Sequence, residues 1–388
     1  MRIYNFILDH RLGGPHAYVL SLARQFAESN VESKIVTAGS GPVTDIPLFR
    51  LRHFGRVLYL VEVVLNVLRI IWLTRRVDFS RVSVFDVHGV GNIAPLIASR
   101  ILGLPVIWHF HEANVGPTIE GLGVLGRWLI RNRPHQIIAV SHRAATVHQS
   151  PQATVLYAPI DLEFWKLSDL ERAHRFSNIK LKIVSVGNLN PLKGFDILLD
   201  AVARLDVLVE LVIVGSVLDS HRAYSKLLFR KANDLQLLGH SVRFTGWVEA
   251  SQVRSEIATS NIFILASKSE AGPMVLYEAM ALETVCIISD VGDARAVLGP
   301  GTGYVLQRMT PGRIVNAIKR AEMLGPAGRE QMGSRARSAI PMSASRSRRA
   351  AAKSSAGAPS SSPDSSVRKS PNGAHCPLSI LRQSHIGS

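Results

Sequence analysis

Short runs of β-branched residues alternate with segments of helical period along most of the chain, and the whole alternation occurs twice. This pattern is typical of parallel sheets built from βαβ units. We therefore predict an α/β fold of two Rossmann-like, doubly wound parallel-sheet lobes, with ligands bound in a cleft beyond the carboxyl ends of the strands. The expected strands cover residues 3–8, 34–37, 82–87, 106–110, 136–140 and 154–157 in the first lobe and 182–186, 211–214, 242–244, 262–266 and 285–289 in the second.

A polar segment separates the two alternating regions, and a tail of different composition follows them. We expect an N-terminal domain at 1–160, a linker at 161–180, a C-terminal domain at 181–338 and a disordered tail at 339–388. The tail is rich in Ser, Arg, Ala and Pro and has no Phe, Tyr or Trp, so it cannot bury enough apolar surface to offset its ordering entropy. A genuine basic tail and a tail produced by translation in a shifted reading frame are both compatible with this composition.

One apolar run, residues 57–73, is interrupted by Glu62, Asn66 and Arg69. These three recur at i, i+4 and i+7, so they form one polar stripe on an otherwise apolar helix. We favour a buried helix with this stripe as its one wet edge over a helix that lies on a membrane surface. A membrane span is the least favoured interpretation, because Arg69 would lie inside the bilayer.

Composition narrows the class of protein. Hydrophobic residues make up 47% of the 388 residues, which excludes wholesale disorder. Two cysteines cannot form a disulfide framework, and Asp9, His10 and Arg11 interrupt the N-terminal apolar run, so we expect a cytoplasmic chain without a secretory signal. The net charge of +16 favours partners that carry phosphate, namely nucleic acid, anionic lipid or a phosphorylated substrate.

Residues 267–278 combine a strand end, a loop and a helix start. Pro273 suits the first turn of a helix, which leaves the amides of residues 274–276 free to bind an anion. Glu270 lies in the loop, and Glu278 lies one to two turns into the helix. These groups suit a sugar nucleotide, with the diphosphate on the amides and sugar hydroxyls on the carboxylates. Alternatively, Glu270 is a solvated loop residue and Glu278 a surface residue.

Lys193 stands where the expected strand at 182–186 turns into the next helix. The carboxyl ends of parallel strands share one edge of a sheet, so Lys193 and Glu270 are expected on the same side, where an ammonium can bind a phosphate. The alternative is a lysine that is merely exposed.

Further short motifs run through both halves of the chain. With the segments around Lys193 and Glu270, they resemble glycosyltransferase family 4, which has the GT-B architecture. The eight-residue separation of the two Glu is the most specific feature, and the resemblance covers about residues 1–338. The other motifs are Gly13-Gly14-Pro15, Asp86-Val87-His88-Gly89, His109-Phe110-His111-Glu112, Ala139-Val140-Ser141, residues 242–248 and Glu278-Ala279-Met280-Ala281.

The resemblance implies a retaining glycosyltransferase that uses a UDP- or GDP-sugar and needs no metal. Glu270, which would bind the donor sugar, and His111, which would lie near the reacting centre, are the expected catalytic residues. Lys193 would bind the diphosphate and Glu278 the ribose. The remaining expected donor contacts are Gly14, Asn188, Gly246, Val248, Gly272, Met274 and Val275.

The resemblance also implies a glycan or lipid-linked acceptor, bound by the first lobe, in surface polysaccharide or glycolipid assembly. Arg50, Arg52, His53 and Arg56 precede the apolar run at 57–73, which suits peripheral contact with anionic lipid at the inner face of the cell membrane. An ordinary solvated basic loop is the alternative. Nucleic acid is not an expected partner, because the basic tail lacks the aromatic residues of a stacking surface.

Departures from the family pattern favour a second function, that of a catalytically impaired GT-B chain that binds a sugar nucleotide or a partner without turnover. Asn188 stands where the family usually has Arg, so one cation for the diphosphate is lost. Ala158-Pro159-Ile160 stands where Asn-Gly is expected, and Glu283 stands where Gly is usual. The helix that normally crosses back to the first lobe is replaced by the tail.

His109 and His111 offer a competing interpretation, because His-x-His at a strand end is also a fragment of hydrolase metal sites. No further grouping with ligand spacing is evident in the sequence, so we expect no metal. Cys286 lies in the middle of an expected strand and is predicted to be part of the core.

Overall fold

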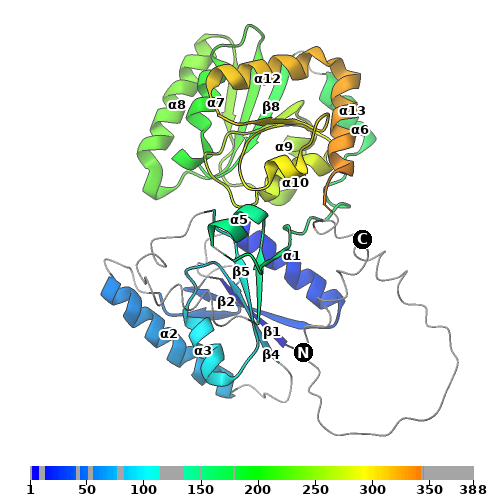
Figure 1. The fold of residues 1–388 in the computed structure, drawn as a ribbon. Coiled ribbons are helices and arrows are strands. Elements are labelled where there is room, and N and C mark those ends of the chain that lie inside the picture. The colour runs from blue at the N-terminus through cyan, green and yellow to red at the C-terminus, as the bar shows by residue number, and fades with distance from the viewer. Residues whose placement is uncertain are drawn as a thin grey trace, which may run out of the picture.

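The computed structural model describes residues 2–7, 14–40, 44–50, 56–76, 83–113, 135–148, 150–177, 180–341 and 344. Two α/β lobes, one from each half of the chain, are stacked one above the other (Figure 1). The predicted fold class is therefore confirmed. Gly13, Arg52, His53 and almost all of the expected tail lie outside the described residues.

The first lobe contains a parallel sheet in the order β3-β2-β1-β4-β5-β6-β7. Strand β1 pairs with both β2 and β4, so the winding reverses between β1 and β4. Such a switch point leaves room for a ligand beyond the carboxyl ends of the strands. The elements are β1 (Arg2–Ile7), α1 (Gly14–Glu28), β2 (Glu32–Ala38), β3 (Ile46–Leu48), α2 (Arg56–Arg76), β4 (Ser83–His88), α3 (Ala94–Leu102), β5 (Val106–Phe110), β6 (Gln136–Ala139), α5 (His142–Val147) and β7 (Thr154–Val155).

The second lobe repeats this winding in the order β10-β9-β8-β11-β12-β13, with its switch point between β8 and β11. All four residues of β11 are buried, as expected for a central parallel strand that is covered on both faces. The elements are α6 (Asp169–Ser177), β8 (Leu181–Val186), η1 (Pro191–Lys193), α7 (Phe195–Val202), β9 (Val209–Val214), η2 (Asp219–His221), α8 (Arg222–Leu237), β10 (Ser241–Phe244), α9 (Ala250–Ala258), β11 (Ile262–Leu265), α10 (Met274–Ala281), β12 (Val285–Ser289), α11 (Ala294–Val297), β13 (Tyr304–Leu306), α12 (Pro311–Met323) and α13 (Gly325–Ser338).

The expected strands are all present, with ends shifted by at most two residues. Within the part of the chain that the structure describes, two strands were not predicted, β3 and β13. Each has three residues and lies at the edge of its sheet, so neither contains a run long enough to show a pattern. Cys286 is buried in β12, which confirms its predicted place in the core.

Helix α2 is turned the opposite way from the prediction. Glu62 and Asn66 were expected on a wet edge but are only 7% and 5% exposed. The Asn66 side chain donates to the carbonyl oxygen of Phe49 at 3.0 Å and accepts from its amide at 2.8 Å, and Arg69 Nε donates to Pro47 O at 3.0 Å. The polar stripe thus satisfies backbone groups within edge strand β3 and directly after it. The prediction of a wet polar edge on a buried helix is therefore wrong.

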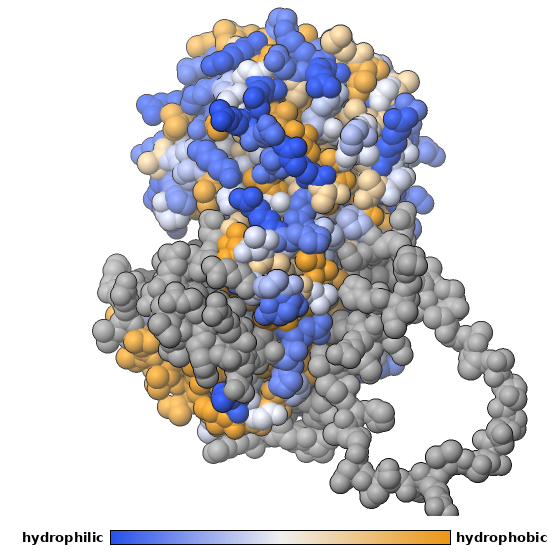
Figure 2. All heavy atoms as spheres, in the orientation of Figure 1, coloured by the Kyte–Doolittle hydropathy of each residue, from blue (hydrophilic) through white to orange (hydrophobic). Residues whose placement is uncertain are grey.

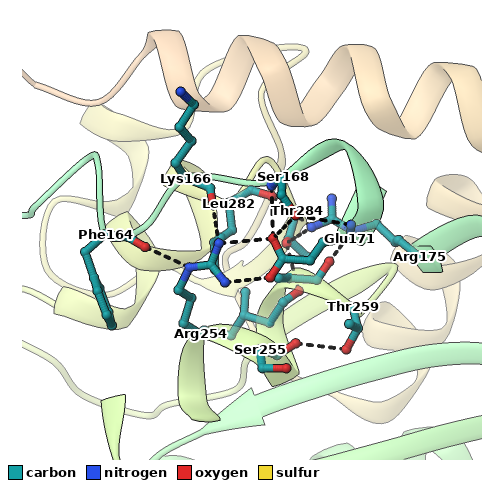
Figure 3. Close-up of polar contacts among 12 residues, drawn as sticks. Phe164, Lys166, Ser168, Glu171, Arg175, Arg254, Ser255, Thr259, Leu282 and Thr284 are labelled. Carbon is teal, nitrogen blue, oxygen red and sulfur yellow. Dashed lines mark hydrogen bonds and ion pairs between the residues drawn. The ribbon is translucent and has the colours of Figure 1, made fainter. Parts of the chain in front are cut away.

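The segment 161–180, expected as a linker, contains helix α6 and packs on the second lobe (Figure 3). Arg175 is 3% exposed, and its guanidinium donates to carbonyl oxygens at the ends of α9 and α10 at 2.8 and 2.9 Å. Arg254 of α9 pairs with Glu171 of α6 at 2.5 Å. Charged side chains thus hold this segment against the ends of two helices of the second lobe.

The two lobes touch at the loop that follows β11. Ala271 belongs to the hydrophobic core cluster of the first lobe. Gly272 approaches Val140 so closely that a Cβ on it would stand 3.1 Å from Val140 O. Nearby, Asp293 accepts from the amide of His142 at 2.7 Å, which places a second-lobe carboxylate at the start of first-lobe helix α5.

Candidate active site

Gly194 lets the loops after β8 and β11 come together at the switch point of the second sheet. Its φ is +66°, and a Cβ on it would stand 2.2 Å from Ala266 O, so a larger residue does not fit. The Asn190 side chain accepts from the amide of Leu192 at 2.9 Å and caps the short turn η1. That turn ends at Lys193, whose side chain therefore reaches the loop after β11.

Lys193 and Glu270, predicted to share this sheet edge, form an ion pair. Lys193 Nζ lies 2.5 Å from Glu270 Oε1, and the Ser267 hydroxyl donates to the same oxygen at 2.8 Å. The two side chains are 24% and 17% exposed, so Glu270 is not a freely solvated loop residue. An ammonium in this position can bind a phosphate oxygen, and the carboxylate can accept hydrogen bonds from hydroxyls.

Helix α10 begins directly after this loop, as predicted. Its N-cap, Pro273, offers no side-chain hydrogen bond, so the amides of Met274 and Val275 are available to bind an anion. The amide of Leu276 was also expected to be free, but it donates to Pro273 O at 3.1 Å. That part of the prediction is wrong, because the helix opens with a tight i→i+3 bond.

Glu278 lies half-buried in the second turn of α10. Burial raises the pKa of its carboxyl to about 7. A hydroxyl that donated a hydrogen bond to Glu278 would favour the ionised form and lower this pKa.

Three more expected donor contacts lie at the neighbouring strand ends. Asn188 follows β8, and its Oδ1 accepts from the amide of Ser216 at 3.3 Å. Gly246 follows β10, accepts from the amide of Gly215 at 3.1 Å and has open space where a Cβ would be. Val248 is half-buried against the core of the second lobe. The backbone after β8, β9 and β10 therefore brings these positions into one region.

Gly14 and His111 belong to the first lobe. Gly14 is exposed and begins α1. One turn later, the ring of Tyr18 lies edge-on to the rings of His88, His109 and His111, with centroid distances of 5.9, 5.5 and 4.9 Å. The start of α1 and His111 therefore lie at the same end of the first sheet.

A buried network surrounds His111, and its connections were not predicted. Asp86 Oδ1 lies 2.8 Å from His109 Nε2, and Asp86 Oδ2 lies 3.4 Å from His88 Nε2. His88 Nδ1 lies 3.0 Å from His111 Nε2. Asp86 and His88 are two residues apart on β4 and share one face, so their Asp-x-His spacing was the signal for this network.

The electrostatics of the network keep His111 uncharged. Burial lowers the pKa of His111 well below its usual value, and His88 and His109 lower it further. Burial opposes ionisation of Asp86, but the two histidines beside it outweigh this effect and hold its pKa below the usual range. His111 is therefore a neutral imidazole at neutral pH, able to form hydrogen bonds but carrying no charge.

The same rings could supply metal ligands, because nitrogen atoms of His88, His109 and His111 all lie within 4.8 Å of one another. Three imidazoles are a ligand set that suits zinc. An ion at this position would replace the hydrogen bond between His88 and His111. The absence of a metal from the reaction remains a prediction.

Two family models match consecutive parts of the chain. Residues 12–164 match Glycosyltransferase Family 4, and residues 169–339 match Glycosyl transferases group 1. The chain is a glycosyltransferase. The first match lies mainly in the first lobe of this glycosyltransferase and begins after β1, and the second lies in the second lobe. The two together contain all of the expected catalytic and donor-binding residues.

Individual proteins resemble this glycosyltransferase over different lengths. D-inositol 3-phosphate glycosyltransferase 1 from Catenulispora acidiphila is 24% identical over 79% of this chain and 82% of its own. TuaC of Bacillus subtilis, named for teichuronic acid biosynthesis, is 34% identical, but the match spans 22% of this chain and 21% of that relative. The crystal structure of Anabaena Alr3699/HepE with UDP-glucose has a TM-score of 0.76 at 17% identity and covers 92% of this chain and 100% of its own. This likeness shows the GT-B fold.

Proposed function

We propose that this glycosyltransferase moves a sugar, with retention of anomeric configuration, from a UDP- or GDP-sugar to a glycan or lipid-linked acceptor. The observation that carries the proposal is the ion pair of Lys193 and Glu270 beside the start of α10. A cation and helix-end amides suit the diphosphate, and a carboxylate suits sugar hydroxyls. The complex of HepE with UDP-glucose supports this donor class.

In this proposal the reaction needs no metal, because protein groups stabilise the charge that develops on the departing diphosphate. Lys193 supplies a full positive charge, and the first amides of α10 supply partial charges. Asn188 can add only a neutral amide where the family usually has Arg, so an Asn188→Arg variant is expected to transfer faster.

The first lobe is proposed to bind the acceptor, with His111 near the reacting centre. Because Nε2 of His111 faces His88, Nδ1 is the nitrogen left to face a substrate. A neutral imidazole there can position a hydroxyl without repelling a cation. We place this reaction in surface polysaccharide or glycolipid assembly, inside the cell and at the inner face of its membrane, consistent with the naming of TuaC for teichuronic acid biosynthesis.

A second candidate is a chain that binds the sugar nucleotide without turning it over. The observation that favours it is Asn188, whose side-chain oxygen is held by the amide of Ser216. Release of UDP or GDP, with NMR assignment of the product anomer, separates the two candidates. Donor binding with no release, with or without acceptors, would support the second. No binding of any UDP- or GDP-sugar would contradict both.

The site itself is tested by Glu270→Gln, which should abolish transfer and leave the fold intact because the residue orients the donor. Glu163→Gln is the matched control, since Glu163 is an exposed carboxylate outside the site. Unchanged turnover in Glu270→Gln would overturn the assignment.

A further inference from the structure

Helix α2 presents an apolar face to solvent. Val61, Val64, Leu65, Leu68 and Trp72 recur at helical spacing, and their exposed fractions lie between 38% and 59%. Figure 2 shows hydrophobic atoms gathered where α2 lies in Figure 1. A surface helix ordinarily turns such a face inward and its polar face outward.

The inverted orientation is fixed by the polar face. Asn66 makes two hydrogen bonds to the backbone of Phe49, and the guanidinium of Arg69 lies 4.8 Å from the centre of the Phe49 ring. Ile70, on the same face, is 2% exposed. Rotating the helix to bury its exposed valines and leucines would break these bonds and leave backbone groups unsatisfied. The exposed apolar face is therefore built into the fold.

We propose that this face docks on an anionic lipid bilayer, with α2 lying in the plane of the interface. By sequence, the helix begins with Arg56 and ends with Arg75 and Arg76, and its single acid, Glu62, is on the buried side. Apolar residues flanked by arginines suit the boundary between acyl chains and anionic headgroups. Among the described helices, none has the length and apolar character to cross a membrane.

The charge of α2 favours an anionic bilayer over a second copy of the chain as the partner of this apolar face. By sequence, α2 has an arginine at its first position and arginines at its last two. Two α2 helices in antiparallel contact would therefore bring helix ends of like charge together, and like charges repel. An anionic surface meets the same arginines with opposite charge. Membrane docking depends on the structure of α2 and not on the donor site. It rests on the proposed function in one respect, namely that a lipid-linked acceptor would lie in the bilayer.

The test is co-sedimentation of the full chain with vesicles of phosphatidylcholine, with or without phosphatidylglycerol. Binding is expected to the anionic vesicles and to weaken as salt rises. The variant Val64→Ser/Leu68→Ser/Trp72→Ser should lower the partition coefficient on the order of 100-fold, since each substitution removes apolar surface from the bilayer. The control Leu237→Ser/Met323→Ser changes residues of the second lobe that are 88% and 85% exposed, and it should bind like the parent.

Equal binding by the triple variant and the parent would overturn the proposal. So would a parent dimer that the triple variant loses in sedimentation velocity, with neither protein bound to vesicles; that outcome would assign the face to a second copy. Calorimetric titration with UDP and GDP in every variant reports on the donor site separately. A failure of membrane docking is thereby distinguished from a failure of the proposed transferase.

Discussion

Replacing Lys193 with Ala removes the ammonium that pairs with Glu270 and, in the proposed function, binds the donor diphosphate. A hydrogen bond from a charged group contributes about 1.5–3 kcal/mol, so UDP or GDP should bind roughly 10- to 150-fold more weakly. The fold should be little affected, because both side chains are partly exposed and such pairs contribute about 1 kcal/mol or less.

The loss should exceed that of the contact alone, because Glu270 is left without its counter-charge. Two unit charges about 6 Å apart repel by roughly 3 kcal/mol at an effective dielectric constant of ~20. The double variant Lys193→Ala/Glu270→Gln should therefore bind UDP more tightly than Lys193→Ala. Glu270→Gln alone should bind UDP at least as well as the parent but bind the UDP-sugar more weakly, because only the sugar needs the carboxylate.

Isothermal titration calorimetry at one salt concentration measures the affinities for UDP, GDP and their sugars. The four proteins compared are the parent, the two single variants and the double variant. Lys268→Ala is the control, because Lys268 is an exposed lysine in the loop after β11. Affinities for both nucleotides that agree within a few-fold between the parent and Lys193→Ala would refute the reasoning, and Lys193 would then be an ordinary surface lysine.

Three further predictions concern pH, packing and the contact between lobes. Burial raises the pKa of Glu278 to about 7, so the folded chain retains a proton that the unfolded chain loses near 4.5. The free energy of unfolding should therefore fall as the pH rises from about 4.5 to 7. Urea denaturation at several pH values should show this slope for the parent but not for Glu278→Gln. Gly333→Ala would put a Cβ 2.0 Å from a backbone oxygen after α10, so it should lose about 1–3 kcal/mol or more in urea denaturation, whereas Gly312→Ala, with open space, should not. Asp293→Ala removes the acceptor for the amide of His142, so it should lower the free energy of unfolding by about 1–2 kcal/mol. It should also increase the radius of gyration measured by small-angle scattering. An unchanged radius would contradict the role of Asp293 in the contact between the lobes.

The fold and the shared sheet edge of Lys193 and Glu270 could be predicted because they depend on rules that act along or at the ends of strands, whereas the ion pair between the two side chains was not predicted. Buried parallel strands need continuous apolar runs, as in β11, and carboxyl ends of parallel strands share one edge. The two residues are 77 positions apart, yet strand order alone brings them to one place.

The orientation of α2 could not be predicted, because periodicity shows that Glu62, Asn66 and Arg69 share a face but not which way that face points. The deciding partner is the backbone of Phe49, 17 residues before Asn66. The connections of the histidine network were hidden for a similar reason, since the contact from His88 to His111 crosses between strands.

Glu283 is a departure from the family pattern that the structure explains. Its φ is +54°, a left-handed conformation that glycine adopts without strain, which accounts for the family's preference for Gly. Here the carboxylate of Glu283 pairs with Arg172 at 2.9 Å. The substitution is visible in the sequence, but the left-handed backbone conformation that explains the family's preference for Gly is visible only in the structure.

The loop after β11 has a mechanical consequence. Glu270 is bonded directly to Ala271, and Ala271 is seated in the hydrophobic core cluster of the other lobe, with Gly272 against Val140. Separation of the lobes must remove Ala271 from that core and displace the adjoining Glu270. Because Glu270 is paired with Lys193, it must also disturb the ion pair. In the proposed function, release of the nucleotide is therefore expected to be coupled to separation of the lobes. A ligand bound at the proposed donor site is expected, in turn, to stabilise the contact between the two lobes.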